Sequence, residues 1–254
     1  MSGLTEETNE SKDFFTMKTE HINIIGLGGI GSWLFRAIVP IIYGDHSRQW
    51  RLQLVDGDHY EAKNLSRQLF AAEALSQNKA EANESWLRQR FGEPEHVMLL
   101  SQNRYVTPEL LPSVIGERST TLLCVDNHVT RKQVSDFTET LKDAILISGG
   151  NDSIDGNVQV MLRRRGRALT PTLGQWHPEI ATPTDKHPAD VSCAELAAAG
   201  DGQTIAANFF AASLMLNAFY FLQFTPKPVL KENEYYFDIL RNGVVGRVRK
   251  HNVA

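Results

Sequence analysis

Cysteine is scarce in this sequence of 254 residues, which contains only Cys124 and Cys193. Two thiols cannot form the disulfide framework of a small secreted domain, and they exclude a four-cysteine zinc site. A chain of this length can bury a hydrophobic core without such cross-links. We therefore expect a cytoplasmic protein that folds without disulfides and without structural zinc.

The sequence also has no excess of basic over acidic residues. Lys and Arg number 26 against 30 for Asp and Glu, which gives a formal net charge of −4. A protein that binds nucleic-acid backbones through a basic face shows the opposite balance, so we expect no nucleic-acid partner. Hydrophobic residues make up 42% and charged residues 22% of the chain, and these values exclude wholesale disorder.

No segment has the pattern of a signal peptide or a membrane anchor. Residues 1–20 are polar and lack an apolar stretch, so we expect a flexible leader there. The most apolar segment, Ile205–Phe224, approaches membrane length, but amides such as Asn208 and Gln223 interrupt it. We expect this segment to form a helix buried in the core or at a subunit interface, and we expect no membrane partner.

Short β-branched runs alternate with helical patterns over the first 150 residues. We predict strands over residues 21–25, 51–55, 96–100, 121–125 and 144–148. One helix follows Gly31 and should kink or end at Pro40, and another covers residues 79–91 before Gly92. This alternation predicts an α/β fold with a Rossmann-like, mostly parallel sheet and helices on both faces.

The pattern changes after Asn151. We predict a further strand over residues 157–162, a long loop with four prolines over 169–190, and a hairpin over 235–248. Ser192 and Glu195 have the spacing of a capping box before the apolar helix. Residues 151–254 are therefore expected to form a C-terminal extension of strand, crossover loop and helix.

A glycine-rich turn follows the first predicted strand. It has the pattern G-x-G-G-x-G, contributed by Gly26, Gly28, Gly29 and Gly31. Backbone N–H groups at the start of the next helix attract phosphate, although a plain tight turn also uses glycine. Asp56 ends the second strand, where a carboxylate can accept both ribose hydroxyls. The alternative for Asp56-Gly57-Asp58 is an ordinary turn.

Cationic and amide side chains follow the second predicted strand. They are contributed by Asn64, Arg67, Gln68 and Lys79. The planar donor fork of a guanidinium suits phosphate oxygens, and an ammonium adds a second positive charge. Asp126 and Asn127 end the fourth strand, at the same edge of the predicted sheet. Two cations for a triphosphate and a carboxylate for Mg²⁺ indicate an ATP site rather than a hydride-transfer site.

Five motifs occur in order over the first 131 residues. They are the glycine turn, Val55-Asp56-Gly57-Asp58, Asn64-Leu65-x-Arg67-Gln68, Lys79-Ala80, and Val125-Asp126-Asn127 with Arg131. This set resembles the ThiF and ubiquitin-activating superfamily. Residues 188–195, the following helix and the C-terminal hairpin are similar to the ThiF-like proteins of the plasmid-associated PRTRC system.

The resemblance implies an ATP-dependent adenylyltransferase, usually a homodimer. Such an enzyme activates the C-terminal glycine carboxylate of a small ubiquitin-like or sulfur-carrier protein and releases pyrophosphate. Residues 21–254 would form a single adenylation domain, with a nucleotide-binding half over 21–150 and a partner-binding half over 151–254.

The resemblance also implies roles for individual residues. It implies catalytic roles for Arg67, Lys79 and Asp126, with Asp126 on Mg²⁺. It implies ATP contacts for Gly26, Gly28, Gly29, Gly31, Asp56, Asp58, Asn64, Arg67, Gln68, Lys79, Asp126 and Asn127.

The sequence departs from the family pattern in three ways. It lacks the two Cys-x-x-Cys zinc pairs, it has no arginine before Gly26, and Gly57 replaces a bulky residue, which is expected to loosen that turn. Two alternatives stay open: a non-catalytic ThiF-like binding subunit, and an NAD(P)- or FAD-dependent Rossmann oxidoreductase.

The two cysteines differ in their surroundings. Cys193 lies at a predicted helix start, which lowers a thiol pKa and favours a nucleophile for thioester or persulfide chemistry. A packed apolar residue is an equally good interpretation of Cys193. Cys124 falls inside a predicted strand and is expected in the core. His177, His187 and Cys193 are the residues that could form another metal site, although their spacing is not a standard ligand pattern.

Overall fold

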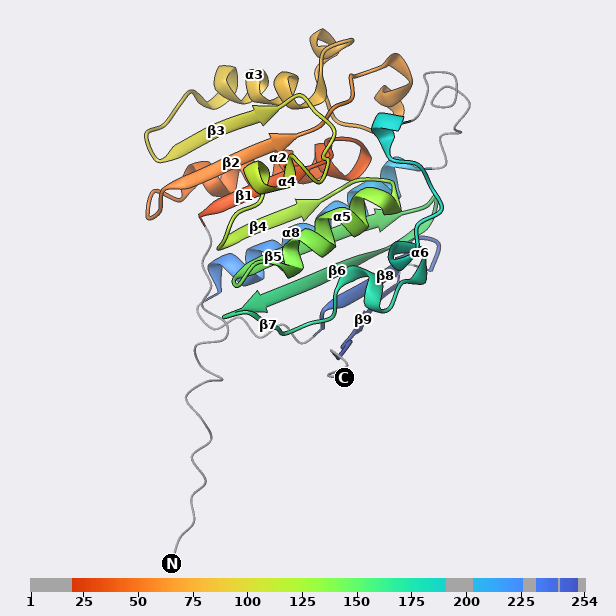
Figure 1. Cartoon of the computed structure of the whole chain (residues 1–254). Helices are drawn as coiled ribbons and strands as arrows, with labels where there is room; N and C mark the ends of the chain where they lie inside the picture. Colours follow the sequence, from red (N-terminus) through yellow and green to blue (C-terminus); the bar gives the residue numbers. More distant parts are fainter. Residues whose placement is uncertain (1–19, 191–202, 226–231, 242, 251–254) are drawn as a thin grey trace, which may run out of the picture.

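The computed structural model describes residues 20–190, 203–225, 232–241 and 243–250 (Figure 1). Their centre is a nine-stranded sheet with the order β3-β2-β1-β4-β5-β6-β8-β9, in which β7 pairs with β6. The order reverses between β1 and β4, which is the point where open α/β sheets bind ligands.

One part of the sheet is parallel and the other antiparallel. The parallel strands are β1 (His21–Ile25), β2 (Trp50–Val55), β3 (Val97–Gln102), β4 (Ser119–Leu123) and β5 (Ala144–Asn151). The antiparallel strands are β6 (Asp155–Arg164), β7 (Arg167–Ala168), β8 (Glu234–Asp238) and β9 (Gly243–Arg247). The predicted mostly parallel, Rossmann-like sheet is confirmed, and the C-terminal strands continue that same sheet.

Helices cover both faces of the sheet, as predicted (Figure 1). One face carries α2 (Gly29–Gly44), α3 (Lys79–Phe91) and α8 (Ile205–Phe224). The other face carries α4 (Leu111–Val114), α5 (His128–Glu139) and α6 (Pro178–Ala181). Short 3₁₀ segments connect them: η1 (Ala62–Ser66), η2 (Ala72–Ala74), η3 (Leu173–Gln175) and η4 (Pro188–Asp190).

The core consists of two apolar clusters, one on each face. On the first face, Leu34 and Phe35 of α2 pack with Ile24 of β1 and Phe219 of α8, and all four are fully buried. Burying one such side chain contributes about 1.5–3 kcal/mol, so this layer fixes the position of α2 beneath the glycine turn.

Helix α8 is long and apolar enough by length and composition to cross a membrane, with a mean hydropathy of 1.6. In the structure it packs against β5, β6 and α2. Its amides Asn208 and Gln223 are fully buried, and Gln223 donates to Thr120 Oγ1 over 2.9 Å. The predicted core helix is confirmed, because one side of α8 is buried against the sheet and α2.

Several element bounds differ from the predicted ones. Of the two outcomes expected at Pro40, an end of the helix is wrong, because α2 continues to Gly44, and a kink stays a prediction. Pro40 is exposed, so water can hydrate the carbonyl that loses its helical donor. Strand β4 lies two residues earlier than predicted, because register with β1 rather than local apolarity sets its end. The predicted loop over 169–190 contains η3, α6 and η4. The predicted capping box at Ser192 and Glu195 lies outside the described residues.

Candidate active site

A large cleft opens at the carboxyl ends of the parallel strands, at the point where the strand order reverses. Its volume is about 1170 Å³. Its lining includes most of the predicted site residues, namely Gly26, Gly28, Gly29, Asp56, Asp58, Asn64, Arg67, Gln68, Lys79, Asp126 and Asn127. The structure therefore brings together residues that are spread over 102 positions of the sequence, from Gly26 to Asn127.

The glycine turn leaves almost no room for side chains. Gly26 has a φ of +87°, and a Cβ there would lie 2.9 Å from the carbonyl of Cys124. A Cβ on Gly31 would lie 1.9 Å from the main-chain oxygen of Gly26. Gly31 is buried and does not line the cleft, so it allows helix α2 to pack closely on the turn. Gly28 is more open, because a Cβ there would meet only Gln68 Nε2, at 3.8 Å.

The Asp56 carboxylate is oriented by two backbone donors. Its Oδ2 accepts from the N–H of Leu27 over 2.6 Å, and its Oδ1 accepts from the N–H of Asp58 over 2.9 Å. Burial raises the pKa of Asp56, and the charge of Lys79 and the two N–H donors oppose that rise. The carboxylate is thus held at the end of β2, beside the glycine turn, in the place where a ribose acid is expected.

Lys79 begins helix α3 and is 4% exposed. Its Nζ lies 2.5 Å from Oδ2 of Asp58, so Asp58 has a partner within the chain. Asn78 caps the helix and donates from Nδ2 to the main-chain oxygens of Asp56 and Asp58 over 2.9 Å. Both the ammonium and the positive end of the helix dipole therefore face the cleft.

The Asn64, Arg67 and Gln68 motif lies on and after η1. Asn64 is buried, and its Oδ1 accepts from the N–H of Glu61 over 2.9 Å, so part of its role is to shape this turn. Arg67 extends into the cleft and its Nη1 donates to Gln203 Oε1 over 3.3 Å. Gln68 is 7% exposed and lies against Gly28.

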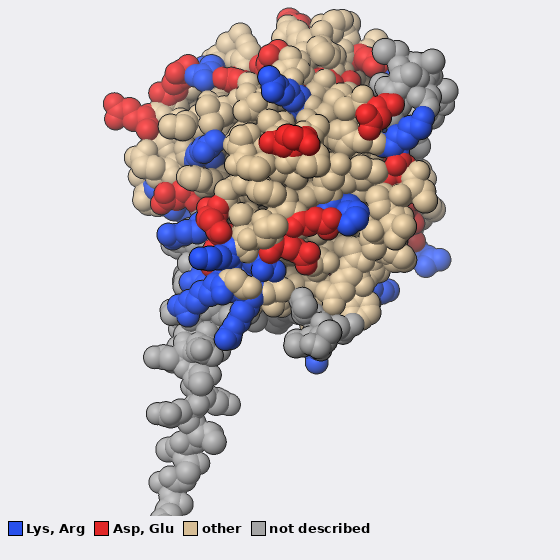
Figure 2. Space-filling model, viewed as in Figure 1, with Lys and Arg blue, Asp and Glu red and all other residues tan. Residues whose placement is uncertain are grey.

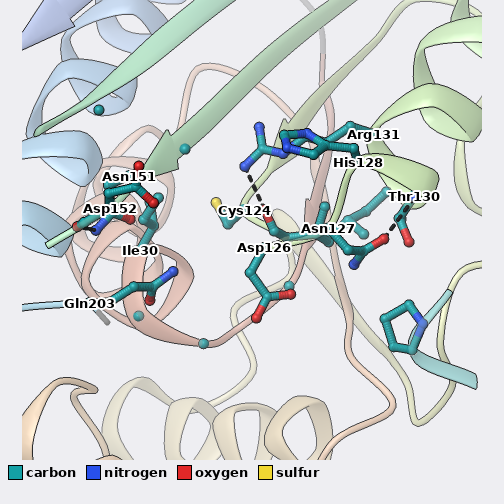
Figure 3. A pocket seen from close by; sticks show the side chains of 18 of the residues that line it. Ile30, Cys124, Asp126, Asn127, His128, Thr130, Arg131, Asn151, Asp152 and Gln203 are labelled. Carbon is teal, nitrogen blue, oxygen red and sulfur yellow. Dashed lines mark hydrogen bonds between the residues drawn. The ribbon is translucent and has the colours of Figure 1, made fainter. Parts of the chain in front are cut away.

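Asp126 projects into the cleft from the loop after β4, as Figure 3 shows. Arg131 connects this loop to strand β5. Its Nη2 donates to the main-chain oxygens of Val125 over 2.6 Å and Gly149 over 2.7 Å. Arg131 also donates to Ser148 Oγ over 2.7 Å. Burial lowers the pKa of Arg131, and the nearby charge of Asp126 opposes this. Arg131 therefore supports the Asp126 loop from within the protein.

The start of helix α5 is capped from two directions beside Asp126. Asn127 Oδ1 accepts from the N–H of Thr130 over 2.8 Å (Figure 3). Asp185 accepts from the N–H groups of His128 over 2.5 Å and Val129 over 3.2 Å. Asn127 thus has a structural role in addition to the one predicted. No local pattern marks Asp185, which lies 57 residues from His128.

The cleft extends beyond the predicted site. It continues along the β5–β6 turn to the β8–β9 hairpin, with lining residues that include Asn151, Asp152, Asp155, Tyr236, Phe237 and Val245. Tyr105, which sequence analysis missed, covers Gly57. A Cβ on Gly57 would lie 2.5 Å from the main-chain N and 2.7 Å from Cγ of Tyr105. Tyr105 thus occupies the space that a bulkier residue at position 57 would need, and the expectation that Gly57 loosens the turn stays a prediction.

Cys124 belongs to the core, as predicted. It is buried, its Sγ lies 3.9 Å from the sulfur of Met215, and burial raises its pKa to about 12 against the charge of Arg131. Such a thiol is protonated at neutral pH and is no nucleophile. Cys193 lies outside the described residues, so both interpretations of it stay predictions.

His177 and His187, the two histidines discussed above as metal ligands together with Cys193, form hydrogen bonds with other groups. His177 bonds Glu234 through Nε2 and Glu179 through Nδ1, the latter over 2.9 Å. His187 Nε2 donates to the main-chain oxygen of Val106 over 2.6 Å. Among the described residues, no group of three or more His, Cys, Asp or Glu side chains is placed to hold a metal ion.

Basic residues gather at the end of the sheet opposite the cleft, where β6 turns into β7 (Figure 2). Arg165 and Arg167 are exposed there, and Arg163 donates from Nε to the main-chain oxygen of Leu141 over 2.8 Å. This run lies at the amino ends of the parallel strands, so it contributes no charge to the candidate site.

Comparison with known proteins identifies the family. The sequence pattern of the ThiF family matches residues 10–252 of this chain. The chain belongs to the ThiF family. Its curated relatives include "Adenylyltransferase and sulfurtransferase uba4" of Emericella nidulans, which is 27% identical over 146 residues, 57% of this chain and 28% of the relative. "Molybdopterin-synthase adenylyltransferase" of Salmonella typhimurium is 28% identical over 164 residues, 63% of this chain and 62% of the relative.

Solved structures share the ThiF-type fold. The structure of E. coli MccB with ATP matches with a TM-score of 0.66 and 16% identity, over 96% of this chain and 67% of that chain. A PaaA structure matches with a TM-score of 0.66 and 15% identity, over 95% of this chain and 67% of that chain. The aligned part covers only about a quarter of the uba4 proteins, so their further segments have no counterpart in the match. The similarity to PRTRC-system proteins stays a prediction.

Proposed function

We propose that this ThiF-family protein is an ATP-dependent adenylyltransferase that activates the C-terminal carboxylate of a small carrier protein. The observation that carries the proposal is the meeting of Arg67, Lys79 and Asp126 around the glycine turn in one cleft. Two cations and a carboxylate suit a triphosphate with Mg²⁺, and neither cation is required for hydride transfer. The names of the relatives, two of which are adenylyltransferases, support the same activity.

In this proposal the nucleotide lies across the carboxyl ends of β1, β2 and β4. The turn from Gly26 to Gly31 faces the phosphates, and Asp56 accepts from the ribose hydroxyls. Mg²⁺ commonly takes one or two protein carboxylates and completes its shell with phosphate oxygens and water. Asp126 fits that requirement, because its exposed carboxylate projects into the cleft beside the phosphate-binding cations.

The chemistry requires positioning and charge neutralisation more than proton transfer. The carrier's carboxylate is ionised at pH 7, so it needs no general base to attack the α-phosphate. The new bond joins that carboxylate oxygen to phosphorus, and the bond to the leaving pyrophosphate breaks. Arg67 and Lys79 offset the negative charge that gathers on the phosphate oxygens. The products are an acyl-adenylate and pyrophosphate.

The part of the cleft beyond Asp126 suits an extended carrier tail. It leads past Asn151 and the β5–β6 turn to the β8–β9 hairpin, where Val244 and Val245 are exposed. The resemblance to the family supports a small ubiquitin-like or sulfur-carrier protein, whose chain ends in glycine, as the partner. A homodimer and a cytoplasmic location are further parts of the proposal that the resemblance to the family supports.

Exchange of labelled pyrophosphate into ATP tests the activity. Wild-type protein with a carrier ending in glycine is expected to catalyse exchange, and Asp126→Ala is expected to lower its rate by about 100-fold or more, the scale seen for loss of one transition-state contact. Asp136→Ala is the matched control, since Asp136 pairs with Lys132 on the outer side of α5. Tight NADH binding without exchange would instead favour an oxidoreductase.

We further propose that the Cys193 thiolate attacks the acyl carbon of the acyl-adenylate, which forms a thioester with the carrier and releases AMP. In the persulfide alternative, Cys193 takes its outer sulfur from a donor persulfide, which leaves as a thiol. A thioester between enzyme and carrier would be cleaved by hydroxylamine or thiols on a gel. Cys193→Ser is expected to abolish this adduct while leaving pyrophosphate exchange intact. Persistence of the adduct in Cys193→Ser would place the nucleophile elsewhere.

A further inference from the structure

The residue just before the cap of helix α8 forms a hydrogen bond with the predicted phosphate-binding arginine. Gln203 lies next to Thr204, which caps α8 through a hydrogen bond from Ala207 N–H. Arg67 Nη1 donates to Oε1 of Gln203 over 3.3 Å, and both side chains line the cleft. Figure 3 shows Gln203 projecting into the same pocket as Asp126. Gln203 and Arg67 are 136 residues apart in the sequence.

Two further contacts fix this end of α8 at the site. Asn208 is fully buried, and its Nδ2 donates to the main-chain oxygen of Arg67 over 3.3 Å. Thr204 Oγ1 donates to the main-chain oxygen of Ser153 in the β5–β6 turn over 2.7 Å. Gln203, just before the cap of α8, therefore contacts the side chain of Arg67, and Asn208 in the first turn contacts its main chain.

Asn208 also packs on the glycine turn. A Cβ on Gly29 would lie 2.4 Å from Asn208 Nδ2 and 2.5 Å from its Oδ1, so the carboxamide occupies the space beside the first residue of α2. No described residue donates a hydrogen bond to the buried Oδ1 of Asn208. A buried amide that leaves one polar atom unpaired carries an energetic cost.

We propose that Gln203 is a positioning residue that orients the Arg67 guanidinium toward the phosphates of bound ATP, while Asn208 fixes the main chain of Arg67. A guanidinium has five N–H donors, and the bond from Nη1 to Gln203 uses one of them, so this contact is compatible with donation to phosphate oxygens. Holding the long arginine side chain in place before ATP binds removes part of the entropy cost of ordering it. The inference rests on the proposed function, because it takes ATP as the ligand.

Binding of Mg·ATP and of adenosine, measured by calorimetry on the full chain, tests the inference. Gln203→Ala is expected to weaken ATP binding about tenfold, equivalent to about 1.4 kcal/mol, and to leave adenosine binding unchanged. Gln203→Glu is expected to weaken ATP binding further, because the added carboxylate pairs with Arg67 and repels the phosphates. In an Arg67→Ala background, Gln203→Ala is expected to have no further effect.

Ser213→Gly is the matched control, since it lowers the stability of α8 at an exposed position away from the cleft and does not touch the Gln203 to Arg67 contact. If Ser213→Gly weakens ATP binding as much as Gln203→Ala does, the effect is helix stability and the positioning role is overturned. If Arg67→Ala weakens ATP binding but Gln203→Ala does not, this inference fails and the proposed function stands. If the wild-type protein binds no ATP, the proposed function itself fails.

Discussion

At the scale of single residues, the glycine turn is defined by how little space it leaves. The Cβ of any residue replacing Gly31 would meet the main-chain oxygen of Gly26 at 1.9 Å, and backbone on both sides prevents relief by a side-chain rotation. The turn, the start of α2 and the end of β1 therefore fit together only with glycine at this position.

Gly31→Ala is expected to destabilise the protein by about 1–3 kcal/mol or more, because an added methyl overpacks a close backbone contact. Gly44→Ala, at the other end of α2, has no atom within 4 Å of the new Cβ. This control is expected to be neutral or to stabilise by about 0.4–1 kcal/mol. Urea unfolding of both variants measures the difference, and equal stabilities would contradict the packing described here.

The carboxylates at the site show how local hydrogen bonds assign roles to residues of the same type. Asp56 is oriented by N–H donors, Asp58 pairs with Lys79, and Asp126 is exposed in the cleft. Asp126 is the most exposed of the three, which favours it for a metal contact. The sequence predicts all three positions from strand ends and motif spacing, but the division of roles depends on contacts that the sequence does not show.

At the scale of elements, a buried charge network ties three segments together below the cleft. His177 precedes α6 and bonds Glu234 of β8, and Glu234 also accepts from Arg249 Nε over 2.5 Å and from Tyr236 Oη over 2.7 Å. Burial alone would raise the pKa of Glu234, but these hydrogen bonds lower it to about 2. Burial would lower the pKa of His177, but its bonds to Glu234 and Glu179 raise it.

The network predicts a pH dependence of stability with two limbs. The contribution of Glu234 is complete above its ordinary pKa of 4.5 and is lost as the pH falls toward 2. The contribution of protonated His177 is complete below its ordinary pKa of 6.5 and is lost as the pH rises through its raised folded value. We therefore expect the stabilisation from this network to be greatest between those two values.

His177→Gln is expected to flatten the alkaline limb and to lower stability at pH 6 by about 1–3 kcal/mol, since a buried carboxylate loses a charged donor. Urea unfolding between pH 5 and pH 9 measures both effects. His21→Gln is the control, since His21 is exposed at the start of β1. An alkaline limb that is equally steep in wild type and His177→Gln would show that His177 does not titrate in the folded protein.

At the scale of the whole molecule, one sheet joins the two halves of the chain. The parallel strands supply the glycine turn, Asp56 and Asp126, and the antiparallel strands extend the cleft to the β8–β9 hairpin. Helix α8 comes from the second half yet packs with α2 and β5 of the first. The net charge of −4 therefore conceals a local group of cations, including Arg67 and Lys79, at the place where both halves meet.

How well a structural feature can be predicted depends on the sequence distance between the residues that form it. The strands, the glycine turn and the motif from Asn64 to Gln68 depend on neighbouring residues, so periodicity and spacing reveal them. The Asp185 cap on α5 and the His177 to Glu234 pair each join segments 57 residues apart, and Gln203 lies 136 residues from Arg67. No local pattern marks such pairs, because they arise only when the sheet brings distant loops to one edge.

Adenylation in this cleft transfers AMP from ATP to the carrier's carboxylate. To test this, ATP labelled at either the α- or the γ-phosphate is incubated with wild-type protein and a carrier ending in glycine, and the mixture is passed through a gel-filtration column. We predict that the α-label elutes with the protein and that the γ-label leaves as pyrophosphate. Protein retention of the γ-label, or release of γ-label only as orthophosphate, would contradict adenylation.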